Sequence, residues 1–264
     1  MSTHSVTGSH PQQILATDEM RFTPQMYMDY HVRRLGIRIE DIGVSPTVIV
    51  TWFTRVRESL TRMVNGETLP NAPFRNVVLG HYNSVPVTVV QCPIGAPGTI
   101  SHMEELIVCG AKRFIGIGAA GSLQPENPIG SLLIPDQCVC EEGTSRHYVS
   151  TETVVRAHGR LAEKLATCAE TLEFPIAVGR QWTTDAIYRE SVADIDRHRK
   201  TGVLGVDMET SAMYALGQVR NVEVANVLAV SDELWHEWNP AFGSERLDIA
   251  LERACAIALA AVYP

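Results

Sequence analysis

Long hydrophobic runs and a surplus of basic residues are both absent from this sequence of 264 residues. The longest apolar run, from Ala254 to Tyr263, covers about half of the roughly 20 residues that a membrane-spanning helix needs, so we expect no membrane partner. The first segment, from Met1 to Pro11, is polar and lacks the apolar core of a secretory signal. Lysine and arginine number 22 against 30 aspartate and glutamate residues, a formal net charge of −8. Since no large basic surface is available to neutralise phosphates, we also expect no nucleic-acid partner.

Cysteine is sparse as well, with six residues along the chain. Only Cys138 and Cys140 are close together, and alternate residues of a strand share one face. A metal-binding thiol pair is one interpretation, but no second Cys/His pair has the spacing of a zinc finger. We therefore expect buried, reduced thiols in a cytoplasmic protein, with no metal and no organic cofactor.

The composition is that of an ordinary folded protein, with 45% hydrophobic and 20% charged residues. A chain of this length buries roughly 70–75% of its surface on folding, so a sizeable core needs neither disulfides nor metal. We expect residues 1–20 to form a mobile tail and residues 21–264 to form a single domain.

Continuous runs of valine, isoleucine and leucine alternate with amphipathic segments along the chain. Such alternation predicts an α/β domain whose sheet is covered on both faces. The expected strands are 44–50, 76–79, 86–91, 113–118, 132–140, 203–206 and 224–230, and the expected helices are 55–64, 99–110, 154–173, 208–219 and 247–263.

Ligands of such sheets bind outside the carboxyl ends of the strands, where unusual residues follow several runs. Gly116-Ile-Gly-Ala-Ala-Gly-Ser122 reads as a strand that enters a glycine turn. The turn is either a tight strand–helix connection or a nest of N–H groups for an anion. The polar loop Glu141–Tyr148 either binds a ligand or caps an element. Both alternatives stay open for each segment.

Two further segments place carboxylates at element ends. In Val206-Asp-Met-Glu-Thr210, two acids flank a methionine at the start of an expected helix. They either cap the helix or accept hydrogen bonds from sugar hydroxyls, with the methionine against the sugar face. In Val230-Ser-Asp-Glu233, Asp232 leaves the strand 224–230, which is where a catalytic acid would be placed.

Taken in order, these segments resemble the nucleoside phosphorylase superfamily, which contains purine nucleoside phosphorylases, uridine phosphorylases and adenosylhomocysteine-type nucleosidases. The resemblance runs from about Ile49 to the C-terminus. It implies a three-layer α/β/α fold with a central mixed β-sheet, and a nucleoside as the small-molecule substrate. The matching segments are 116–124, 129–135, 142–148, 182–190, 206–212 and 230–232.

The resemblance also implies roles for single residues. Glu209 would bind the ribose 2′- and 3′-hydroxyls, with Met208 under the sugar. Asp232 would donate a proton to purine N7, and Arg246 is the candidate for the arginine that positions this acid. The remaining expected substrate contacts are Asp207, Ser231, Thr184 and His147, with Ile187 or Tyr188 stacked on the base.

The segment Tyr188-Arg-Glu190 lacks the Gln/Arg clamp with which uridine phosphorylases bind uracil. The resemblance therefore implies a purine rather than a uracil base. Members of the superfamily are commonly dimers, trimers or hexamers, so a homo-oligomer is also implied.

The expected phosphate site departs from the family pattern. Where relatives carry Gly-Asp-Pro-x-Arg after the first strand, this chain has 50–56, with bulky Trp52 and Phe53 and only Arg55 kept. Gly116 stands at the position of a second phosphate arginine. The remaining candidates for a phosphate or water site are Arg55, Arg75 and the backbone of Ala119, Ala120 and Gly121.

Three functions follow from this mixture of matches and departures. Phosphorolysis to free base and ribose 1-phosphate, with inorganic phosphate as co-substrate, is slightly favoured. Hydrolysis by water is the alternative, although 51–55 contain no acid and Glu58 lies about a turn further on. The third is a non-catalytic nucleoside-binding or storage protein, which the presence of both Glu209 and Asp232 disfavours.

Overall fold

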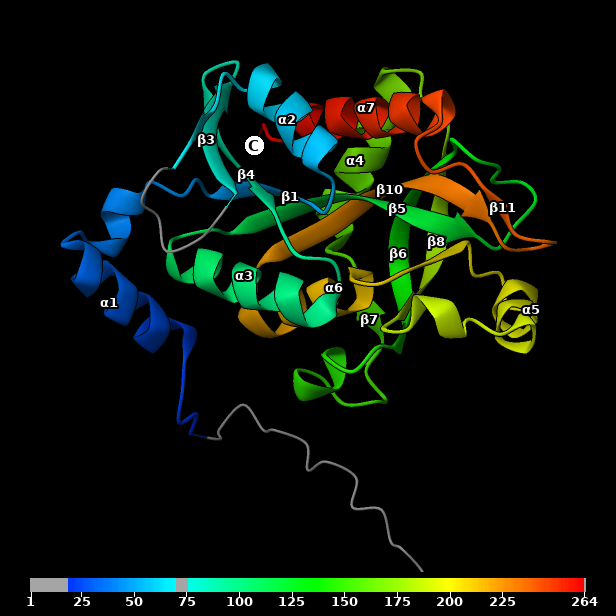
Figure 1. Ribbon diagram of the computed structural model, residues 1–264, viewed down its shortest axis with the longest axis horizontal. Helices are drawn as coiled ribbons and strands as arrows, with labels where there is room; N and C mark the ends of the chain where they lie inside the picture. Colours follow the sequence, from blue (N-terminus) through cyan, green and yellow to red (C-terminus); the bar gives the residue numbers. More distant parts are fainter. Residues whose placement is uncertain (1–18, 70–75, 264) are drawn as a thin grey trace, which may run out of the picture.

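The computed structural model describes residues 19–69 and 76–263, and in them a mixed sheet carries helices on both faces (Figure 1). The strands are β1 (Thr47–Thr51), β2 (Glu67–Thr68), β3 (Val77–Tyr82), β4 (Val85–Gln91), β5 (Arg113–Ser122), β6 (Leu132–Glu141), β7 (Val155–Arg156), β8 (Ile176–Thr184), β9 (Gly205–Asp207), β10 (Glu223–Glu233) and β11 (Asn239–Pro240). The helices are α1 (Pro24–Leu35), α2 (Thr54–Met63), α3 (Ala96–Val108), α4 (Gly159–Thr171), α5 (Val192–Lys200), α6 (Thr210–Arg220) and α7 (Glu245–Ala260), with 3-10 turns η1 (Ile39–Ile42), η2 (Ser145–His147) and η3 (Ile187–Arg189).

The strand order is β11-β10-β6-β8-β9-β5-β1-β4-β3-β2, and β10 also pairs with β5. The strands β5, β9, β8, β6 and β10 therefore close on themselves, while β1, β4, β3 and β2 extend the sheet to one side. β5 runs parallel to β1 and β10 and antiparallel to β9. This mixed sheet between helical layers confirms the expected fold class.

Each face of the sheet has its own apolar core. On one face, α2, α4 and α7 bury side chains such as Leu60, Leu165 and Leu251 against the strands (Figure 1). On the other face, α1, α3 and α6 bury side chains such as Met28 and Met103. Full burial of one such side chain contributes roughly 1.5–3 kcal/mol, so the two layers hold the strand ends in place.

The glycine-rich segment is a strand and not the expected turn, because β5 continues through it to Ser122. A Cβ atom at Gly116 would lie 2.3 Å from Oδ1 of Asn226, and one at Gly118 would lie 2.8 Å from the ring of Trp52. The glycines therefore make room for the side chains of Asn226 on β10 and of Trp52 directly after β1. Successive N–H groups of a strand point to opposite edges, so this segment forms no anion nest.

Other boundaries agree with the sequence or differ from it for local reasons. Asn83 and Ser84 form a two-residue hairpin turn between the expected strands β3 and β4, both with positive φ (45° and 70°). The helix expected over 154–173 begins only at Gly159, because Val155 and Arg156 pair with β6 as β7. Strand β8 and helix α5 are further elements that the sequence analysis did not anticipate.

Most of the expected tail, and the candidate phosphate residue Arg75, lie outside the described residues. Within the described ranges, no helix combines the length and apolarity needed to cross a bilayer.

Candidate active site

Gly121, near the carboxyl end of β5, is the point at which the two acidic segments meet. In the strand ladders it pairs with Val206 of β9 on one side and with Asp232 of β10 on the other. A Cβ atom at Gly121 would lie 3.4 Å from Oδ2 of Asp232. The sheet therefore brings together, at the carboxyl end of β5, two segments that lie about 25 residues apart in the sequence.

Asp207 ends β9 and caps the helix that follows. Its Oδ1 accepts a 2.7 Å hydrogen bond from the Thr183 hydroxyl, and its Oδ2 accepts one of 3.0 Å from the backbone N–H of Thr210. The Thr210 hydroxyl donates to the same Oδ2. Burial raises the pKa of Asp207, while the bonds from Thr210 and Thr183 lower it. The capping alternative is therefore the observed role of this acid.

Glu209 lies at the N-cap position of α6 but does not cap that helix with its side chain. Its Oε1 instead accepts a 2.6 Å hydrogen bond from the backbone N–H of Gly95, where α3 begins. Burial and the neighbouring Asp207 raise the pKa of Glu209 to about 8. No side chain of the described ranges donates a hydrogen bond to this carboxyl group, so it is available to hydroxyl groups of a ligand.

Asp232 is buried, with 8% of its surface exposed, and each of its oxygens has a donor. Oδ1 accepts a 2.7 Å bond from the Ser231 hydroxyl, and Oδ2 accepts a 2.9 Å bond from the indole N–H of Trp238. The Ser231 hydroxyl also lies 3.3 Å from the carbonyl oxygen of Ala120. Trp238 was not among the residues expected from the sequence.

Glu233 fixes the β10–β11 hairpin that carries Trp238. Its carboxylate accepts bonds from the Ile129 N–H and the Asn239 amide, both at 3.0 Å, and lies 3.1 Å from Nε2 of His236. The bonds from Asn239 and Ile129 hold the pKa of Glu233 below its usual value. A buried, ionised carboxylate with several donors anchors the hairpin to the β5–β6 connection.

The polar loop after β6 is tied to the start of α6. Glu142 accepts bonds from the backbone N–H groups of Thr144 and Ser145, and a 2.9 Å bond from the Ser211 hydroxyl. His147 lies exposed on η2 in the same loop. The loop therefore has a capping function through Glu142, which the sequence analysis had not singled out.

The expected base-side residues follow β8. Thr184 is buried, and its hydroxyl accepts a 3.3 Å bond from the Ala186 N–H. Ile187 and Tyr188 on η3 are 47% and 95% exposed, so both are open to a ligand and Tyr188 projects into solvent. Burial and the charge of Asp232 raise the pKa of Glu190 to about 7, which places this acid in the field of Asp232. Met208 is half-buried beside Glu209.

Of the expected cations, Arg55 and Arg246 lie in the described ranges, and neither forms a hydrogen bond or an ion pair with Glu209 or Asp232 there. Arg55 on α2 forms an ion pair with Asp248 of α7. Arg246 is exposed on the first turn of α7, against Gly130, and the structure gives no contact between it and Asp232. Ala119 and Ala120 lie within β5, paired with Ala229 and Val230 of β10.

Trp52 covers the strand where an anion would approach. Its indole N–H donates a 2.8 Å bond to the Thr99 hydroxyl, and its ring lies against Gly118. The side chain is 8% exposed. The bulk of Trp52 therefore fills the space beside β5 next to the end of β1.

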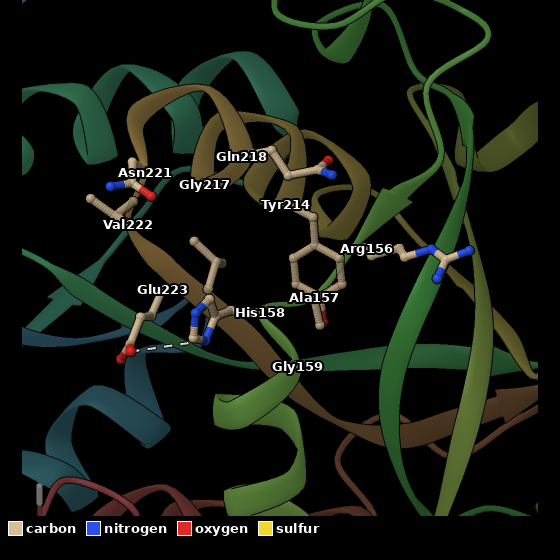
Figure 2. A pocket seen from close by; sticks show the side chains of 11 residues that line it. Arg156, Ala157, His158, Gly159, Tyr214, Gly217, Gln218, Asn221, Val222 and Glu223 are labelled. Carbon is tan, nitrogen blue, oxygen red and sulfur yellow. Dashed lines mark ion pairs between the residues drawn. The ribbon is translucent and has the colours of Figure 1, made fainter.

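A cavity of about 560 Å³ lies elsewhere, at the amino end of β10 (Figure 2). Arg156, His158, Gln218 and Glu223 are among its lining residues, and His158 Nδ1 lies 3.9 Å from Glu223 Oε1. Since Asp232 lies at the opposite end of the same strand, this cavity is separate from the acidic site.

Metal ligation was expected to be absent. In the ranges the structure describes, no group of three or more His, Cys, Asp or Glu residues could hold a metal ion. Cys138 is buried and Cys140 exposed, and both are free thiols.

Comparisons with known proteins show the family to which the chain belongs. The chain is 30% identical to a uridine phosphorylase of Thermococcus kodakarensis over 66% of this chain and 68% of the relative. It is 29% identical to a guanosine phosphorylase of Halorubrum lacusprofundi over 60% and 66%. Among solved structures, a purine nucleoside phosphorylase from Toxoplasma gondii in complex with immucillin-H superposes with a TM-score of 0.78 at 27% identity, over 86% of this chain and 92% of that one. A uridine phosphorylase from Vibrio fischeri gives 0.75 at 30% identity, over 83% and 92%. The family model described as "Phosphorylase superfamily" matches residues 48–263, and the chain belongs to this superfamily, among its nucleoside phosphorylases.

Proposed function

We propose that the protein cleaves the N-glycosidic bond of a purine nucleoside, with inorganic phosphate as acceptor and free base and ribose 1-phosphate as products. The observation that carries this proposal is that the segments bearing Glu209 and Asp232 lie on either side of β5 at its carboxyl end, where Gly121 pairs with Val206 and with Asp232. The reaction needs no organic cofactor.

Glu209 supports the sugar half of this reaction. Its buried carboxyl group receives no hydrogen bond from a side chain of the described residues, so the 2′- and 3′-hydroxyls of a ribose are suitable partners. As the C1′–N9 bond lengthens, the sugar acquires positive charge, and the negative charge of Glu209 in its ionised form lowers the energy of that state. The half-buried Met208 suits the apolar face of the sugar.

Asp232 supports the base half. An oxygen of phosphate supplies an electron pair to C1′, the C1′–N9 pair moves into the base, and a proton from Asp232 neutralises N7. Ser231 helps this exchange, because its hydroxyl can turn from Oδ1 of Asp232 to the Ala120 carbonyl and leave Oδ1 free to carry the proton. The acid regains its proton from water when the base has left.

We propose a purine because Asp232 can act as the acid only on a base that has an N7 atom. Uracil has none. The named relatives include uridine, guanosine and purine nucleoside phosphorylases, so they do not indicate which base this protein binds. The choice of a purine in this proposal is based on Asp232.

Hydrolysis is the second candidate, and Trp52 and Arg55 favour it. Trp52 fills the space beside Gly118, and Arg55 is paired with Asp248 rather than free for an anion. Loss of a guanidinium contact removes one of the stronger interactions with phosphate. Phosphorolysis therefore implies a cation from another source, and a neighbouring subunit of the homo-oligomer that we propose is one such source.

One assay separates these possibilities. The purified protein is incubated with inosine, guanosine, adenosine and uridine, with and without phosphate, and base release is followed by chromatography. We expect phosphate-dependent release of purine and formation of ribose 1-phosphate. Release that is unchanged without phosphate contradicts phosphorolysis and supports hydrolysis. Nucleoside binding without release from any substrate contradicts an enzymatic role.

A further inference from the structure

Trp238 contacts the proposed catalytic acid but has no role in the reaction described above. It lies on the β10–β11 hairpin, and its indole N–H donates a 2.9 Å hydrogen bond to Oδ2 of Asp232. The side chain is 58% exposed although it reaches a carboxylate that is only 8% exposed. The ring thus stands at the open side of the acid, where a ligand would arrive, and not in the core.

The hairpin holds this indole in a fixed place. Asp232 pairs with Pro240 and Glu233 with Asn239 across the two strands. Glu233 accepts bonds from both Ile129 and Asn239, so the hairpin is joined to the β5–β6 connection as well as to its own second strand. A donor fixed in this way can select between ligands, because little ordering is needed when the ligand binds.

The edge of a purine that carries N7 also carries the 6-substituent. In guanine and hypoxanthine, N7 and O6 are two neighbouring acceptors, whereas adenine presents N7 beside an N6 amino group that donates. An indole N–H is only a donor. When Oδ1 of Asp232 gives its proton to N7, Oδ2 of the acid and O6 of the base are neighbouring acceptors, and an N–H between them satisfies both.

From this geometry we infer that Trp238 is a specificity-determining residue, which makes the protein prefer 6-oxopurine nucleosides, such as inosine and guanosine, over adenosine. The inference rests on the proposed function, since Asp232 must meet N7. With adenosine, the indole N–H faces the N6 amino group, which is another donor, so the hydrogen bond that O6 would accept is not formed.

The test compares kcat/KM for inosine, adenosine and purine riboside, which has no 6-substituent. We expect the wild-type protein to prefer inosine over both others by about tenfold or more, as one buried donor–acceptor pair allows. In W238F the inosine-to-adenosine ratio should fall to within about threefold of unity. Any general effect of the substitution on Asp232 alters all three substrates and cancels in the ratio.

Trp235 provides the matched control. It lies in the same hairpin, and its buried indole nitrogen has no hydrogen-bond partner in the described structure. W235F makes the same chemical change without touching Asp232, so the wild-type ratio should persist. The preference of wild-type protein for inosine over purine riboside needs no variant, and so it also tests the inference if W238F folds poorly.

The possible results distinguish a failure of this inference from a failure of the proposed function. Equal kcat/KM for inosine and adenosine in wild-type protein, or a preference unchanged in W238F, overturns the role of Trp238 and leaves purine cleavage intact. No base release from any purine nucleoside overturns the proposed function and the inference with it.

Discussion

Glu209 occupies the N-cap position of α6, yet its carboxylate binds the N–H of Gly95 at the start of α3, across 114 positions of sequence. The helix is capped instead by Asp207, two residues earlier. Two acids that look alike in the sequence therefore have different duties. Asp207 accepts hydrogen bonds from the protein with both oxygens, whereas Glu209 can accept hydrogen bonds from a ligand.

Removal of the charge of Glu209 should impair ribose recognition. In Glu209→Gln we expect kcat/KM for a purine ribonucleoside to fall by about 10- to 100-fold, because hydrogen bonds to a charged acceptor contribute about 1.5–3 kcal/mol. Substrates without 2′- and 3′-hydroxyls are the control, since for them the variant and the wild type should differ much less. An equal loss on both classes of substrate would remove Glu209 from the sugar site.

The raised pKa of Glu209 gives a pH dependence with a definite sign. Burial and Asp207 raise this pKa to about 8, so the acid is largely protonated below that pH. Sugar hydroxyls donate to the ionised form, and nucleoside affinity should therefore increase as the pH rises through about 8. Calorimetric titration of a slowly cleaved nucleoside in buffers of different ionisation enthalpy measures the expected proton release. In Glu209→Gln the increase should vanish.

The contribution of Asp232 to the rate should be large for a nucleoside whose N7 must be protonated and small for one whose base is already positively charged. We expect Asp232→Asn to lower kcat for inosine by about 10²- to 10⁴-fold, the usual contribution of general acid catalysis. A 7-methylated purine nucleoside already carries positive charge on that ring, so its cleavage should be far less affected. Near wild-type turnover of inosine by the variant would refute the role of Asp232 as acid.

The fold was predictable where sequence pattern and burial agree. The runs around Thr47–Thr51 and Glu223–Glu233 are apolar and buried, and both were expected as strands. β8 was missed because Gly179-Arg-Gln181 interrupts its pattern. Gly179 is there because the side chain of Leu204 lies where a larger residue would extend, 3.2 Å from its Cβ position. The contact between Gly179 and Leu204 arises only when the strands pair, so the sequence alone does not indicate it.

The site was predictable in the same uneven way. Glu209 and Asp232 stand in recognisable segments, and the sheet brings those segments together at Gly121. Trp238 lies six residues beyond Asp232, and only the hairpin turns it back onto the acid. Arg246, which the resemblance implied for that place, lies exposed on the first turn of α7, and the structure gives it no contact with Asp232.

Asp207 should affect stability more than ribose binding, because both of its oxygens already accept hydrogen bonds from Thr183 or Thr210. In Asp207→Ala, α6 loses the bonds to the Thr210 N–H and hydroxyl, and the Thr183 hydroxyl loses its acceptor. We expect the free energy of unfolding to fall by about 1–3 kcal/mol, from the lost cap and the unpaired buried donor. Urea denaturation measures this. Ser191→Ala, which removes the exposed cap of α5, should cost about 1 kcal/mol or less and provides the matched comparison.

Gly116 offers the sharpest test of how the strand supports the site. A Cβ there would lie 2.3 Å from Oδ1 of Asn226, whose amide donates a 2.9 Å bond to the Thr210 hydroxyl, which in turn donates to Asp207. Gly116→Ala must therefore displace Asn226, and we expect a loss of about 1–3 kcal/mol of unfolding free energy together with reduced kcat/KM.

Gly110→Ala, where a Cβ meets nothing within 4 Å but the backbone has φ of +104°, controls for the backbone cost alone. It should lower stability without altering kcat/KM. Loss of stability in Gly116→Ala with unaltered kcat/KM would show that Asn226 supports the fold and does not reach the catalytic acids.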